Sequence, residues 1–301
     1  MKVYHQTVAV DGLDIFYREA GPRGAPGVLL LHGFPSSSFM FRHVLPALAD
    51  RYRMVAPDYP GFGYSCFPDP DQFDYSFENY ARVLDAFTQV VGLDRYVLYL
   101  HDYGCPIGLR LALLHPTRVT GLIVQDGNAY EEGLGPQWDT AKAYWREPTP
   151  ANRKRLPDWL NADGTREQYT AGVPAEQIRL FAPDTWTLDW ALMSRPGNVE
   201  VQFDLFTDYR TNVQLYPRFQ EFFRKYRPSA LVIWGRHDAY FDVAEAECYR
   251  RDLPEAEVHV LDAGHKALET HCAEITELIR EFLARKLVST GMVEKRRRGG
   301  T

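Results

Sequence analysis

The sequence YVLYLHDYGCP at residues 96–106 joins a short apolar run to a helical pattern through one acidic residue, Asp102. The continuous apolar run at 96–101 predicts a buried strand, and the apolar residues that follow Gly104 predict a helix. Asp102 therefore lies on a tight strand-to-helix turn, for which Gly104 leaves room. A carboxylate on such a turn points out of the strand, and the helix dipole favours its negative charge.

Strand and helix patterns alternate on both sides of this turn, except between residues 128 and 227, where prolines interrupt helical segments that carry Trp and Tyr. Alternation of this kind is typical of a parallel sheet covered by helices. We predict an α/β protein with a mostly parallel central sheet flanked by helices. Its core comprises residues 1–127 and 228–288, a helical cap comprises residues 128–227, and residues 289–301 form a disordered tail. Strands are expected at 8–10, 13–18, 27–31, 53–57, 96–101, 119–125, 230–234 and 257–261, and helices at about 36–50, 77–91, 104–114, 243–251 and 269–286.

The composition excludes several classes of protein. The chain has 301 residues, of which 45% are hydrophobic and 25% charged, with a net charge of −6. No apolar run reaches the roughly 18 residues that a membrane span needs, and the acidic balance argues against nucleic acid as a partner. Four cysteines without metal-binding spacing, and an N-terminus unlike a signal peptide, favour a cytoplasmic protein with reduced thiols. We expect a monomer or homodimer.

Two further polar residues follow predicted strands in the last third of the chain. Asp238 follows the strand at 230–234, and His265 follows the strand at 257–261. Because the carboxyl ends of parallel strands meet at one edge of the sheet, both side chains can converge on Asp102. A nucleophile, an acid and a base in this chain order are expected of an α/β-hydrolase triad.

Four short motifs carry a resemblance to a known family. HGFP at 32–35 is similar to the HGxP motif of epoxide hydrolases, and HDYG at 101–104 resembles their HDWG turn, with Tyr103 in place of Trp. WGRHD at 234–238 and the Gly264-His265 pair match the strand ends that carry the acid and the base. Over residues 1–287 the chain resembles the epoxide hydrolase and haloalkane dehalogenase branch of the α/β-hydrolase fold, and this implies a sheet core with an inserted helical cap.

The resemblance also implies a mechanism. Asp102 attacks an sp³ carbon of a hydrophobic small molecule and forms an alkyl ester, and water activated by His265 then hydrolyses the ester. Asp238 orients the imidazole, and the backbone N–H groups of Phe34 and Tyr103 stabilise the oxyanion. No metal or organic cofactor is required. The substrate pocket is expected to include Trp145, His32 and Pro35.

An epoxide oxygen needs an acid as it leaves, and relatives supply it from cap tyrosines. Tyr209, in the segment DYRTN at 208–212, is the best match, and Tyr144 is the nearest candidate for a second tyrosine. The aligned position of that second tyrosine is Ala141, about one turn before Tyr144. Tyr130 and Tyr169 are the reserve candidates. The most favoured function is therefore epoxide hydrolysis to a vicinal diol.

Two alternatives are kept. Haloalkane dehalogenation is disfavoured by Tyr103 and Phe34, which stand where halide-binding Trp and Asn side chains are expected. A noncatalytic protein that binds a small molecule in the same pocket is suggested by Lys266, a cation directly after His265 that either acts on the imidazole or points into solvent. Leu100 and Cys105 replace small residues of the family's turn, so a crowded turn is expected there.

Overall fold

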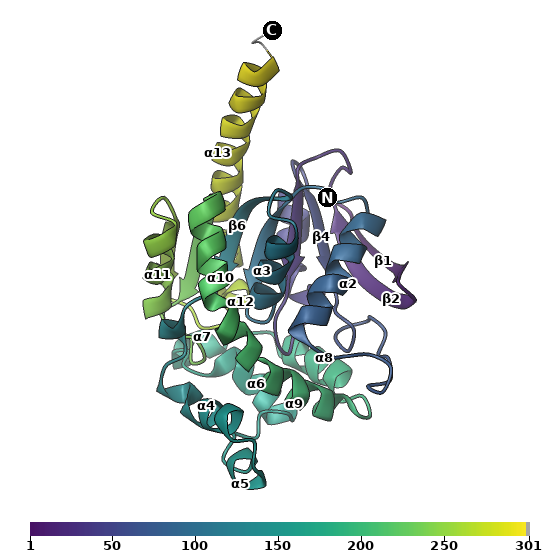
Figure 1. The fold of residues 1–301 in the computed structure, drawn as a ribbon, viewed down its shortest axis with the longest axis vertical. Coiled ribbons are helices and arrows are strands. Elements are labelled where there is room, and N and C mark those ends of the chain that lie inside the picture. The colour runs from purple at the N-terminus through teal and green to yellow at the C-terminus, as the bar shows by residue number, and fades with distance from the viewer. Residues whose placement is uncertain (299–301) are drawn as a thin grey trace.

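The computed structural model describes the fold of residues 1–298 and contains one eight-stranded sheet (Figure 1). Its strand order is β1-β2-β4-β3-β5-β6-β7-β8. The pairs β1–β2 and β2–β4 are antiparallel, and every other neighbouring pair is parallel. This arrangement confirms the mostly parallel sheet. The strands are β1 Val3–Val10, β2 Leu13–Ala20, β3 Gly27–Leu31, β4 Arg53–Pro57, β5 Tyr96–His101, β6 Val119–Gln125, β7 Ala230–Gly235 and β8 Glu257–Leu261.

Burial of the strands follows their place in the sheet. Every residue of β3, β4, β5 and β7 is buried, whereas β1, at one edge, is mostly exposed or half-buried. Central strands that are covered on both faces read as continuous apolar runs, which explains why the sequence located them well.

Helices cover the two faces of the sheet, and each face has its own apolar core. One core packs helices α2, α3, α10 and α11 against the sheet, and the other packs α1, α12 and α13. Figure 1 shows α10, α3 and α2 side by side on the first face. The bounds on the first face are α2 Phe77–Val90, α3 Gly104–Leu114, α10 Arg210–Tyr226 and α11 Ala244–Asp252. Those on the second face are α1 Val44–Leu48, α12 Ala267–Thr270 and α13 Cys272–Arg298.

A helical cap lies beyond the carboxyl ends of the parallel strands, at the end of the molecule opposite the C-terminus (Figure 1). One part of the segment expected as cap, helix α10, lies elsewhere. Its residues Phe219, Phe222 and Phe223 are buried in the same core as α3 and α11, so α10 belongs to the layer over the sheet. The cap helices are α4 Asp139–Arg146, α5 Pro150–Arg153, α6 Ala162–Thr170, α7 Ala175–Ile178, α8 Asp184–Met193 and α9 Asn198–Asp208, preceded by short 3-10 turns η2 Glu131–Gly133 and η3 Pro136–Trp138.

Two helices differ from expectation. The helix expected at 36–50 is divided into a 3-10 turn, η1 Ser38–Phe41, and α1. Ser37 caps the start of η1 by accepting a hydrogen bond from the Phe39 amide at 3.3 Å. The last helix, α13, continues to Arg298, ten residues into the segment predicted as a disordered tail; the final residues of that tail, 299–301, lie outside the described part.

Within residues 1–298, no helix combines the length and apolarity needed to cross a bilayer. All four cysteines fall in the described part of the chain and are free thiols.

Candidate active site

The turn after β5 presents Asp102 in a strained backbone conformation. Its φ is +49°, in the left-handed region that non-glycine residues rarely adopt. Glycines make this turn possible because they allow close approach. A Cβ on Gly104 would lie 2.2 Å from the Leu31 carbonyl oxygen, and a Cβ on Gly33 would lie 2.3 Å from the Asp102 Cβ. The sequence thus holds a carboxylate against the loop after β3.

The Phe34 amide donates a hydrogen bond to Asp102 Oδ1 at 2.5 Å. One of the two amides expected to stabilise the oxyanion, that of Phe34, therefore contacts the Asp102 carboxylate directly. Tyr103 begins the next helix as its N-terminal cap, but no hydrogen bond joins its amide to the carboxylate among the described contacts. An oxyanion hole built on Phe34 is therefore supported by a direct contact, and Tyr103 by its position alone.

His265 stands between two carboxylates. Its Nδ1 lies 2.8 Å from Asp238 Oδ2, and its Nε2 lies 3.9 Å from Asp102 Oδ2. The Asp238 partner fixes the tautomer, since Nδ1–H donates to the carboxylate and leaves the Nε2 lone pair facing Asp102. Asp238 is itself held by the amides of Tyr240 and Phe241, which donate to Oδ1 at 2.7 and 3.1 Å. The three residues predicted as a triad meet in space.

A third acidic residue, Asp126, lies beside the triad and was missed. It follows β6 with a φ of +44° and accepts a hydrogen bond from the Gly235 amide at 2.7 Å. Burial, and then the charge of Asp238, raise its pKa well above the ordinary value. Its position after a predicted strand at 119–125 is the same signal that located Asp102 and Asp238.

Asp126, Asp238 and His265 each bring a ligand atom within 4.8 Å of the others. Such spacing is compatible with a metal ion. However, His265 bonds Asp238 directly, and Asp126 is used by the Gly235 amide. Each of the three side chains thus already has a hydrogen-bond partner, and the geometry supports the pairing of His265 with Asp238 that a catalytic triad requires.

A mainly apolar cavity of about 220 Å³ opens above Asp102 between core and cap. Two tyrosines, Tyr103 and Tyr240, line it together with Asp102. Burial raises the pKa of both phenols, with the charge of Asp102 contributing at Tyr103 and that of Asp238 at Tyr240. Both therefore stay protonated at neutral pH. The lining residues are Phe34, Asp102, Tyr103, Gln137, Trp138, Thr140, Ala141, Leu156, Pro157, Trp159, Gln168, Phe206, Ala239, Tyr240 and Phe241.

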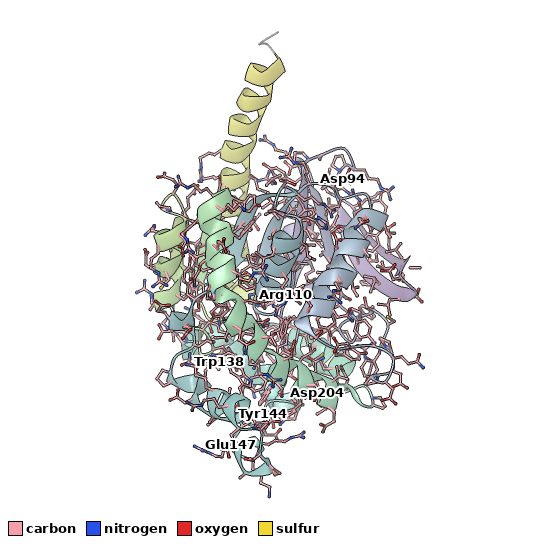
Figure 2. The ribbon with its side chains drawn as sticks, viewed as in Figure 1. Asp94, Arg110, Trp138, Tyr144, Glu147 and Asp204 are labelled. Carbon is pink, nitrogen blue, oxygen red and sulfur yellow. The ribbon has the colours of Figure 1, made fainter. Side chains whose placement is uncertain are left out.

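The structure does not bring the expected cap tyrosines to this cavity. Tyr209 is fully buried, and its hydroxyl accepts a hydrogen bond from Asn128 Nδ2 at 3.2 Å. Trp138, which does line the cavity, stacks on the Tyr209 ring at 5.1 Å and occupies the wall. Tyr144 packs on Phe203 among the cap helices, at 5.5 Å between ring centroids, away from the sheet (Figure 2). Neither tyrosine is among the residues that line the cavity, and their roles as lid acids stay predictions.

The reserve tyrosines are also occupied elsewhere. The Tyr130 hydroxyl donates to Asp252 at 2.8 Å, and the Tyr169 hydroxyl donates to buried Asp189. Ala141, the position aligned with the family's second tyrosine, does line the cavity, so no phenol comes from that position.

Three residues expected in the pocket lie outside its lining. Trp145 donates from Nε1 to the Phe206 carbonyl and borders a separate hollow with Lys142. His32 is buried and stacks on Tyr59 at 4.1 Å, and burial lowers its pKa to about 3, so it is a neutral structural residue. Pro35, joined to Phe34 by a cis peptide bond, is buried, and only Phe34 of the two lines the cavity.

Known proteins are similar to this chain in sequence and in fold. A family model described as alpha/beta hydrolase fold matches residues 26–271. An uncharacterized hydrolase of Saccharomyces cerevisiae is 42% identical over 285 residues, covering 93% of this chain and 97% of the relative. A cis-3-alkyl-4-alkyloxetan-2-one decarboxylase of Xanthomonas campestris is 30% identical over 303 residues, covering 91% and 93%.

Solved structures of other proteins have a similar fold. A haloalkane dehalogenase loop variant from Bradyrhizobium elkanii has a TM-score of 0.75 at 23% identity, covering 97% of this chain and 99% of that one. An epoxide hydrolase from Vigna radiata has a TM-score of 0.71 at 21% identity, covering 94% and 98%. At such identities the likeness concerns the fold. The family match over residues 26–271, to which the mostly parallel sheet conforms, shows that this protein belongs to the alpha/beta hydrolase fold family.

Proposed function

We propose that this hydrolase opens epoxides to vicinal diols through an ester on Asp102. The observation that carries the proposal is the placement of Asp102 Oδ2, 3.9 Å from His265 Nε2, in an apolar cavity that two protonated phenols line. An apolar cavity suits a hydrophobic small molecule, and a carboxylate attacks an sp³ carbon. The phenols of Tyr103 and Tyr240 replace the cap tyrosines as proton donors.

The reaction balances with these groups. Asp102 forms a C–O bond to the epoxide carbon while the ring C–O bond breaks, and a phenol gives its proton to the departing oxygen. Water then attacks the ester carbonyl carbon and transfers a proton to His265, while the Phe34 N–H stabilises the oxyanion. The intermediate collapses to the diol, whose second hydroxyl takes the proton from His265, and the carboxyl proton left on Asp102 returns to the phenolate.

A second candidate is ring opening of a strained four-membered lactone. The relative named as an alkyl-substituted oxetan-2-one decarboxylase covers more than nine-tenths of both chains, which favours it. Haloalkane dehalogenation has less support, because Phe34 and Tyr103 replace the halide-binding side chains. Trp138 also lines the cavity, but its Nε1–H is already donated to the Tyr240 carbonyl at 2.7 Å.

The test traps the ester. His265→Gln removes the base for hydrolysis, so an attacked substrate stays on the protein and is detected by intact-protein mass spectrometry. A small epoxide should add its full mass to the peptide that contains Asp102, whereas the matching chloroalkane should add its mass without HCl if it reacts. The control His265→Gln/Asp102→Asn should add nothing. Diol formation without an Asp102 adduct would refute the covalent mechanism, and tight ligand binding without turnover, unchanged by Asp102→Ala, would favour a binding protein.

The phenols are tested separately. Tyr103→Phe and Tyr240→Phe should each lower epoxide turnover by about a hundredfold to ten-thousandfold, the usual contribution of a positioned acid. Tyr209→Phe is the matched control, since its hydroxyl bonds Asn128 outside the cavity lining. Full activity in the Tyr103→Phe/Tyr240→Phe double variant would contradict their role.

A further inference from the structure

Lys266, directly after the base, is a buried cation within the site. It is 2% exposed, and its ammonium is held by three groups. It donates to the Phe34 carbonyl at 2.8 Å, lies 3.4 Å from His101 Nε2, and stands 5.7 Å from the centre of the Tyr169 ring. A charged side chain is costly to bury, and these contacts fix its position.

The His101 imidazole that contacts the Lys266 ammonium group is neutral. Its Nδ1 lies 3.0 Å from the Gln125 carbonyl, so Nδ1–H donates there and Nε2 keeps a lone pair for the ammonium. Burial and the charge of Lys266 hold the pKa of His101 well below the ordinary value. The proton of the pair therefore resides on Lys266 and not on the His101 ring.

This charge acts on the nucleophile through one residue. Phe34 accepts from Lys266 with its carbonyl and donates to Asp102 Oδ1 with its amide at 2.5 Å. Burial lowers the pKa of Lys266, and of the acids that oppose this effect, Asp102 acts most strongly, ahead of Asp189, Glu269 and Asp238. Glu269 already forms an ion pair with Arg42 at 2.6 Å. Asp102, Asp189 and Asp238 are the remaining acids that act on Lys266.

We propose that Lys266 is a positioning residue that favours hydrolysis of the Asp102 ester over its formation. The inference rests on the proposed covalent mechanism. Negative charge leaves the Asp102 carboxyl group when the ester forms, and returns to it as an oxyanion when water attacks. A fixed cation near this group therefore does not assist the first step and stabilises the second. By holding the Phe34 carbonyl, Lys266 also keeps the Phe34 amide aligned for that oxyanion.

The experiment compares the two steps in Lys266→Met, in which a neutral side chain of similar length replaces the lysine. Rapid quenching and intact-protein mass spectrometry measure the rates of ester formation and decay with a small epoxide. Formation should be no slower than in wild type, since the cation stabilises the reactant carboxylate. Decay should slow by about tenfold or more, and the ester should accumulate during turnover. Lys266→Arg, which keeps the charge, should restore part of the decay rate.

Lys142→Met is the control, because Lys142 also donates to a backbone carbonyl, that of Leu134, but in the cap. Its ester formation and decay should match wild type. Equal slowing of both steps in Lys266→Met, or unchanged ester occupancy, would overturn the inference while the proposed function stands. If the epoxide fails but a chloroalkane or β-lactone esterifies Asp102, the proposed function fails and the same comparison is made with that electrophile. If none of them esterifies Asp102, both are rejected.

Discussion

The buried carboxyl group of Asp189 predicts an unusual dependence of stability on pH. Asp189 lies in α8 of the cap, 2% exposed, and accepts a hydrogen bond from the Tyr169 hydroxyl, which also approaches Ser36 of the core at 3.4 Å. Burial raises its pKa from 3.8 to about 7. The folded protein therefore keeps a proton that the unfolded chain releases, so stability falls as pH rises from about 4 to 7.

The size of the effect follows from the two pKa values. The difference between 3.8 and about 7 corresponds to roughly 4 kcal/mol of folding free energy at high pH. Roughly 2 to 3 kcal/mol of this loss falls between pH 5 and 8. Asp189→Asn cannot ionise but still accepts from Tyr169 through its amide oxygen. The variant should therefore gain stability over wild type as pH rises.

The assay is urea unfolding of both proteins at several pH values from 5 to 8. The difference in free energy of unfolding, variant minus wild type, should grow by roughly 2 to 3 kcal/mol over this range. Asp184→Asn, at an exposed acidic residue in the first turn of the same helix, should give a difference that does not change with pH. A constant difference for Asp189→Asn would refute the argument, because it would mean that Asp189 ionises alike in the folded and unfolded states.

Two further substitutions test the geometry around the nucleophile. Gly33→Ala places a Cβ 2.3 Å from Asp102 Oδ1 and should slow ester formation by about a hundredfold or more. Gly24→Ala is the control, because its Cβ would have no atom within 4 Å, and it should leave the rate of ester formation unchanged. Equal rates of ester formation in the two variants would contradict the close approach of Gly33 to Asp102. Asp126→Ala should lower the free energy of unfolding by about 1–3 kcal/mol because it leaves the Gly235 amide unpaired, and Asp126→Asn should lower it much less, as measured by denaturant titration.

The strand ends could be predicted because local sequence determines them. Central strands are apolar throughout, and the polar residues that follow them meet at one edge for topological reasons. Asp102, Asp238 and His265 were located in this way, and Asp126 lay within reach of the same rule. Local pattern was sufficient where the position of a residue depends on its own strand.

The cap could not be predicted to the same depth, because its side chains are placed by contacts between distant segments. Aromatic residues at helical spacing look alike whether they face the cavity or the interior of the cap. Trp138 stacks on Tyr209 and takes the cavity wall, which no local pattern indicates. Helix α10 likewise has an amphipathic pattern that suits a cap helix or a helix over the sheet. The phenol of Tyr240 was missed because it comes from the core loop after Asp238.

The departures from the family pattern at the nucleophile turn are accommodated by glycines elsewhere in the chain. Leu100 was expected to crowd the turn, but its Cδ2 fills space beside α3 where a Cβ on Gly108 would lie only 2.3 Å away. Cys105 is accommodated in the same way, since a Cβ on Gly127 would lie 2.8 Å from the Cys105 Cβ. Each large residue at the turn therefore depends on a missing side chain on another element. With this room available, Asp102 keeps its left-handed conformation and its contact with the Phe34 amide. A position that looks incompatible with the turn when taken alone becomes compatible once its spatial partner is known, so the departures do not argue against a functional nucleophile.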